Sequence, residues 1–159
     1  MRSELITPFD PCKLERVLPL TEAVYGLHEA GREYAEELQQ LSLMIGGVVG
    51  KIDVLAAFGS IGADEFAQRL TIDWKAIPTD LSNVELLELV DAICEGQGRA
   101  VVLEYWIKTL ALNTGDDKVS DLMYWPEQYL GDGYDGRELT PTEILDRALT
   151  KRRSAKNYC

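Results

Sequence analysis

The sequence predicts an all-α protein, and three observations support that fold class. Apolar residues recur at helical spacing along several segments, capping residues precede most of these segments, and no segment shows the alternation of a β-strand. The chain has 159 residues, of which 46% are hydrophobic and 27% charged, a composition that suits one domain or one domain with a helical extension. We expect an N-terminal helical region over residues 1–79 and a second helical domain over 80–159.

The N-terminal region is expected to begin with an irregular segment, residues 1–19, because this stretch contains three prolines. Thr21 is a suitable cap for the helix that follows. From there, apolar or small residues alternate in steps of three and four, which is the spacing of a heptad seam. The seam consists of Val24, Leu27, Gly31, Tyr34, Leu38, Leu41, Ile45, Val48, Ile52 and Leu55.

Two interpretations of this seam remain open. It can form a coiled coil with a partner chain, including a homodimer, or it can pack a long helix or helical hairpin over residues 21–58 on its own domain. We favour the hairpin because Gly46, Gly47 and Gly50 indicate a bend. A membrane span over this stretch is disfavoured because Lys51 and Asp53 would lie at its centre, at a cost of about 3 kcal/mol each.

Connecting elements and caps divide the rest of the chain. A short helix is predicted over residues 63–70, and Pro78 interrupts the connector that follows it. Ser82 and Glu85 have the spacing of a capping box, so a helix is expected to start there and to end near Gly96.

Three more elements are predicted towards the C-terminus. A second helix of the C-terminal domain is expected over residues 99–112, and a short turn over 120–126 should end at Pro126. A glycine-rich acidic loop then leads to a last helix, which Thr140 caps with Pro141 in the first helical position.

The net charge of −11 is concentrated in the second half of the chain. Residues 80–146 hold 15 acidic and four basic side chains, whereas residues 147–159 hold five basic and no acidic ones. An acidic field of this kind repels nucleic acid and anionic membranes and attracts cationic partners. We therefore expect neither a nucleic-acid partner nor a membrane partner.

Catalysis and cofactor binding are not expected. The only histidine, His28, has no nucleophile motif near it, and the sequence contains neither a phosphate-binding glycine loop nor a cluster of metal ligands. Three cysteines without a CxxC motif argue for a reducing compartment. The first residues lack the apolar run of a signal peptide. The expected location is therefore the cytoplasm.

The most informative segment is the short turn at Tyr124 and Trp125, just before Pro126. Aromatic residues of this type dominate the binding energy of protein interfaces. Acidic residues flank the pair at Asp116, Asp117, Asp121 and Glu127. An acidic border around aromatic anchors suits a basic protein partner. The alternative is that one or both rings fill the core.

Residues 81–150 resemble the colicin and pyocin nuclease immunity proteins. The resemblance consists of the segments NVELLELVDAIC, VVLEYWIKTLALNT, SDLMYWP and TPTEILDRAL, in that order. In that family the short third helix has a Ser-Asp-Leu sequence, an aliphatic residue, two tyrosines and a proline. Ser120, Asp121, Leu122, Tyr124 and Pro126 match this pattern directly. Met123 takes the aliphatic position, and Trp125 replaces the second tyrosine.

The resemblance implies a four-helix immunity fold that inhibits a toxin made by the same cell, and by analogy with that family the toxin would be a nuclease. It assigns Asp121, Tyr124 and Trp125 to the shared toxin contact. In that family the second helix sets specificity, so the resemblance assigns Glu104 and Lys108 to partner selection. Asp117 belongs to the acidic border of the aromatic pair and is also assigned to toxin binding.

The chain departs from the family in two ways. The loop over 127–139 is longer, and the first 79 residues have no counterpart. We therefore interpret the chain as an extended relative, the partner of a larger secreted or contact-delivered toxin. The alternative function is a coiled-coil adaptor or scaffold that acts through residues 24–55.

Overall fold

A computed structural model describes residues 1–132 and 134–156, with side chains up to Lys151. The described residues form ten helices and no β-strand, apart from one isolated bridge between Phe9 and Ile72. The all-α fold class is therefore confirmed. The chain divides into two compact units, one formed by Thr7–Asp73 and the other by Met1–Ile6 together with Trp74–Cys159. Cys159 and the basic side chains beyond Lys151 lie outside the described residues.

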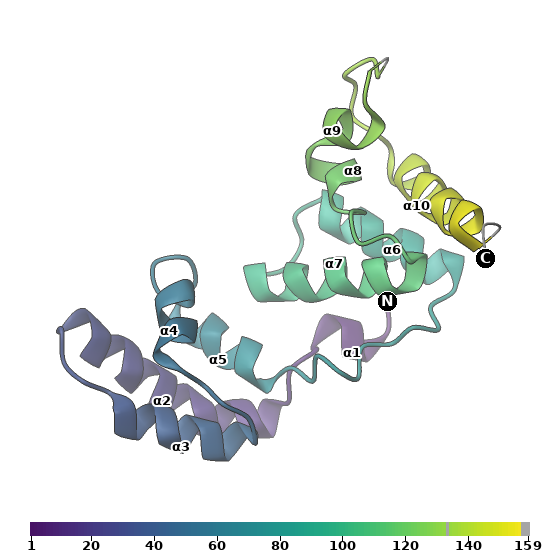
Figure 1. The fold of residues 1–159 in the computed structure, drawn as a ribbon. Coiled ribbons are helices and arrows are strands. Elements are labelled where there is room, and N and C mark those ends of the chain that lie inside the picture. Colours follow the sequence, from purple (N-terminus) through teal and green to yellow (C-terminus); the bar gives the residue numbers. More distant parts are fainter. Residues whose placement is uncertain (133, 157–159) are drawn as a thin grey trace. The chain divides into compact units, whose positions relative to one another are not determined.

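The N-terminal unit, Thr7–Asp73, is built around a helical hairpin. Its helices are α2 (Pro11–Glu29), α3 (Ala35–Ile45), α4 (Lys51–Ala57) and α5 (Ala63–Thr71). Helix α2 packs against both α3 and α5, and Figure 1 shows α2 and α3 lying side by side. The core of the unit consists of Val17, Val24, Tyr34, Leu41, Val49, Val54, Ala57, Phe66 and Ala67.

Helix α2 begins ten residues earlier than the sequence analysis expected. The Asp10 side chain accepts a hydrogen bond from the Lys13 backbone N–H at 3.1 Å, and Pro11 occupies the first turn, where its missing N–H costs nothing. Pro19 lies inside the helix. Thr21 is buried rather than capping, and its hydroxyl donates to the Leu18 carbonyl at 2.8 Å. Residues 1–19 are thus largely helical, not irregular.

The heptad seam is divided between separate helices. Its first part packs within the unit, whereas Gly46 ends α3 in the left-handed conformation, with φ of 71°. Glycine adopts this conformation without steric cost, so the chain turns here. Beyond the turn Val48 is 94% exposed, and Ile52 and Leu55 are also exposed. The seam therefore does not continue as one helix through residues 24–55.

The second unit contains three longer helices and three short ones. They are α1 (Ser3–Ile6), α6 (Asn83–Cys94), α7 (Ala100–Thr114), α8 (Asp121–Tyr124), α9 (Pro126–Leu130) and α10 (Pro141–Lys156). Helix α6 packs against α7 and α10, and α10 also contacts α7. The predicted capping box at Ser82 and Glu85 is present, with the serine hydroxyl accepting from the Glu85 backbone N–H at 3.4 Å. The four-helix immunity arrangement itself stays a prediction.

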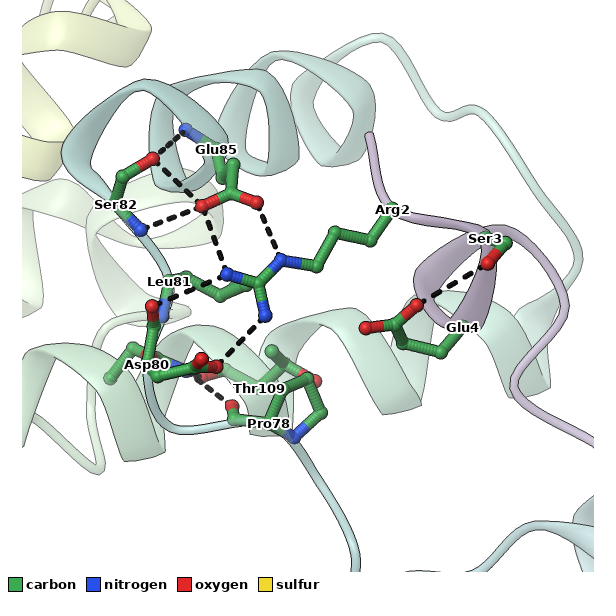
Figure 2. Close-up of polar contacts among 10 residues, drawn as sticks. Arg2, Ser3, Glu4, Pro78, Asp80, Leu81, Ser82, Glu85 and Thr109 are labelled. Carbon is green, nitrogen blue, oxygen red and sulfur yellow. Dashed lines mark hydrogen bonds and ion pairs between the residues drawn. The ribbon is translucent and has the colours of Figure 1, made fainter.

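Residues Met1–Ile6 belong to this second unit because several polar contacts hold them there. The Trp106 indole N–H donates to the Leu5 carbonyl at 2.6 Å in the buried interior. The Arg2 guanidinium contacts Glu85 at 2.6 Å and Asp80 at 2.8 Å, as Figure 2 shows. The hydrogen bonds from Arg2 and from Ser82 lower the pKa of Glu85 to about 2. The observed division therefore differs from the expected boundary at residue 79, because these contacts join segments about 80 residues apart.

The buried contact between Trp106 and Leu5 gives a prediction for stability. Replacing Trp106 with phenylalanine leaves the Leu5 carbonyl without its donor, and we expect a loss of about 2 kcal/mol in the free energy of unfolding. All three tryptophans lie in this unit, so urea titration followed by tryptophan fluorescence reports on it alone. The matched control, Trp125→Phe, changes an exposed ring and should stay within about 0.5 kcal/mol of the parent. Equal effects of the two substitutions would contradict this account.

Candidate functional site

The candidate site is a short turn formed by α8 and α9. Trp125 separates the two helices with a non-helical backbone conformation, φ of −144° and ψ of 58°. The residue before a proline is disfavoured in the helical region, so Pro126 enforces this break. Contrary to the expectation that Pro126 only ends the turn, it also occupies the first position of α9, which extends to Leu130. The buried side chains of Val119 and Leu122 fix the turn to the core of the unit.

The turn leaves both aromatic rings partly open to solvent. Tyr124 is 47% exposed and Trp125 is 53% exposed. Their ring centroids lie 5.7 Å apart with an interplanar angle of 59°, so the rings contact each other in a tilted arrangement. Contacts between aromatic rings at this separation stabilise the pair. The two rings therefore form one aromatic surface, and neither ring is enclosed in the core.

A buried carboxylate holds the turn in place. Only 1% of the Asp116 side chain is exposed, and the Lys151 ammonium of α10 lies 2.7 Å from its Oδ1. The Tyr129 hydroxyl of α9 donates a hydrogen bond to Oδ2 of the same carboxylate, and the Lys118 backbone N–H donates to Oδ1 at 3.2 Å. The Lys151 ammonium also lies 4.8 Å from the centre of the Tyr129 ring. One carboxylate thus joins the segment before the turn to α9 and α10.

The ionisation of Asp116 reflects these contacts. Burial by itself would raise the pKa of Asp116, but the hydrogen bonds from Lys151 and Tyr129 outweigh it and hold the pKa below its ordinary value. In return, the hydrogen bond to Asp116 raises the pKa of Lys151, and burial together with Asp116 raises the pKa of Tyr129. Asp116 is therefore charged in the folded protein at neutral pH.

The remaining predicted residues form two groups. Asp121 is half-buried at the start of α8, one helical turn before Tyr124. Glu104, Lys108 and Asp117 line a groove of about 610 Å³ along the exposed side of α7, together with apolar side chains. The Lys108 ammonium lies 5.2 Å from the centre of the Trp74 ring, a cation–π contact. Among the described residues, this groove is lined by neither Tyr124 nor Trp125.

The roles of Asp116, Tyr129 and Lys151 could not be predicted from the sequence, in which Asp116 is one of several acids that flank the aromatic pair. Its partners lie 13 and 35 residues away along the chain, so no local spacing could indicate them. His28, for which no catalytic role was expected, lies in the N-terminal unit. Its Nδ1 is 3.0 Å from the Tyr34 hydroxyl, and its ring packs edge-on against Phe58.

Comparisons with known proteins give no assignment. No family model, curated protein or solved structure matches this chain. Within the part of the chain that the structure describes, no three metal-ligating side chains gather as a metal site would require, and no helix is both long and apolar enough to cross a bilayer.

The buried Asp116 carboxylate gives a prediction with a defined pH dependence. Replacing Asp116 with asparagine removes the ion pair with Lys151, and we expect a loss of about 2 kcal/mol in the free energy of unfolding at pH 7. Because the folded-state pKa of Asp116 is lowered, its stabilising contribution is present above the ordinary aspartate pKa of about 4 and is lost as the pH falls through the folded-state value. The difference between parent and variant should therefore stay constant from pH 7 to about pH 5 and shrink as the pH falls further towards pH 3.

Urea unfolding at a series of pH values measures this difference. Asp146→Asn is the matched control, because Asp146 is an exposed aspartate on α10. The free energy of unfolding of the control should match that of the parent at every pH. A difference for Asp116→Asn that stays constant down to pH 3 would show that the carboxylate does not stabilise the fold through its charge.

Proposed function

We propose that this chain is an immunity-type inhibitor, which binds and neutralises a toxin domain made by the same cell. The observation that carries the proposal is the exposed pair of rings, Tyr124 and Trp125, on a turn anchored by buried contacts. Rigid tyrosine and tryptophan side chains bury a large area at a small entropic cost, and they are the side chains most enriched among interface hot spots. The proposal involves no catalytic step and no cofactor.

The charges around the rings support a basic partner. Asp117 and Glu127 are exposed on either side of the turn, and Asp121 is half-exposed within it. The segment over 80–146 carries most of the excess negative charge of the chain. Complementary charge accelerates the encounter of two proteins and disfavours wrong partners, while the aromatic contacts slow dissociation. A toxin domain that binds nucleic acid has the positive surface that this arrangement needs.

The proposed mechanism is exclusion rather than chemistry. An acidic protein bound beside the nucleic-acid-binding surface of a nuclease would repel the substrate by charge and block it by bulk. In this scheme Tyr124, Trp125 and Asp121 form the shared contact. The groove of Glu104, Lys108 and Asp117 on α7 would select the cognate toxin, since it combines both signs of charge with an apolar lining.

The partner can be identified through gene context. We expect a toxin gene directly next to the gene for this chain. Co-expression of the two products should yield a complex that survives pull-down, and cells that carry the toxin gene should survive only when this chain is present.

The rings provide the direct test of the proposal. Replacing both Tyr124 and Trp125 with alanine should weaken the complex by about 4 kcal/mol, roughly a thousandfold in dissociation constant, as loss of two interface anchors does. Isothermal titration calorimetry measures the affinity, and circular dichroism checks that the fold is intact. Leu43→Ala is a matched control, because Leu43 is an exposed apolar side chain in the other unit, and it should leave the affinity unchanged. Full protection by the folded double variant would contradict the site assignment.

A further inference from the structure

A cavity of about 430 Å³ opens beside the Tyr124 ring. It lies between the C-terminal end of α6, the α8–α9 turn and the loop that leads to α10. Ile93, Leu139 and Ile144 contribute apolar surface to its lining, and these three side chains are buried in the core. Tyr124 therefore faces this cavity as well as solvent.

Two carboxylates give the cavity a negative charge. Glu127 and Glu138 both line it and both are exposed. Among the described residues, neither side chain takes part in an ion pair or accepts a hydrogen bond. Both charges are therefore available to a ligand.

The one basic side chain of the lining is already neutralised. The Arg137 guanidinium makes a two-point contact with the Glu143 carboxylate, with one nitrogen–oxygen distance of 2.9 Å, and its Nε lies 3.5 Å from Asp135. The Cys94 thiol also lines the cavity, and nearby carboxylates act on it. Burial, followed by the nearby charges of Asp91 and Glu138, raises the pKa of this thiol. Burial disfavours charge of either sign, so it is the nearby carboxylates that favour a positive group over a negative one at the cavity.

We propose that this cavity receives an arginine side chain of the bound protein. The planar guanidinium can stack on the Tyr124 ring while it donates hydrogen bonds to a carboxylate, and the three methylene groups suit the apolar lining. The inference rests on the proposed function, in which a basic protein docks on the Tyr124–Trp125 turn. It adds a second anchor, on the side of the turn that faces α6 and α10.

The Cys94 thiol provides a reporter for the test. In a chain with Cys12→Ser and Cys159→Ser, the rate of Cys94 alkylation by iodoacetamide is measured with increasing N-acetyl-arginine amide, on the alkaline plateau of the pH–rate profile. The thiol is fully ionised there, so a bound cation can slow alkylation by blocking access but cannot speed it by lowering the pKa of the thiol. The matched probe is N-acetyl-citrulline amide, which has the same shape without the charge. A single side chain should bind with a dissociation constant of about 10 mM, so about 20 mM of the arginine probe should slow alkylation roughly threefold. The citrulline probe should change the rate by less than a fifth of that effect.

Substitutions of the two carboxylates complete the test. Glu127→Gln together with Glu138→Gln should abolish the protection. The control pair, Glu22→Gln with Glu29→Gln, removes the same net charge from exposed positions of α2 and should retain it. No protection by the arginine probe, or equal protection by citrulline, overturns the cavity assignment.

The outcome is independent of the toxin, because the probe experiment contains none. Protection of Cys94 without binding of the toxin would overturn the proposed function and leave a cation site at the cavity. Toxin binding that depends on Tyr124 and Trp125, without protection of Cys94, would overturn the arginine anchor alone.

Discussion

The geometry of the aromatic turn depends on one buried charge. The Asp116 carboxylate lies just after α7 and binds groups from α9, from α10 and from the backbone at Lys118. A buried carboxylate without these partners would carry a large desolvation cost, so the three segments must meet around it. The α8–α9 turn is therefore fixed at both ends, by Leu122 in the core and by Tyr129 on Asp116. A fixed turn can present two partly exposed rings without a large loss of entropy on binding.

Local signals in the sequence predicted the elements that depend only on neighbouring residues. The capping boxes at Ser82 and Thr140 were identifiable because the cap and its glutamate are three residues apart. The prediction of an irregular segment at Pro11 and Pro19 was wrong, because proline disfavours only the interior of a helix and is tolerated in the first turn. Here Asp10 caps a helix that begins with one proline and tolerates the other.

Features that depend on distant parts of the chain could not be predicted. The glycines at 46, 47 and 50 predicted the bend after α3, but the heptad spacing showed neither the earlier break between α2 and α3 at Gly31 nor the exposure of Val48. The contacts of Arg2 with Asp80 and Glu85 span about 80 residues and place the first residues in the second unit. The sequence predicted the aromatic pair of the candidate site, because it is contiguous. The carboxylate that anchors it and the cavity beside it come from segments that only the fold brings together.

Fluorine NMR of the chain labelled with 5-fluorotryptophan can show whether Trp125 becomes buried when the toxin binds. Its three tryptophans give three signals, which Trp→Phe variants assign. On titration with the toxin encoded next to this chain, we expect the Trp125 signal to shift and to lose its sensitivity to solvent. The signal of the buried Trp106 should not move. A complex in which Trp125 keeps the fluorine chemical shift and the solvent exposure of the unbound protein would show that this turn is not the binding surface.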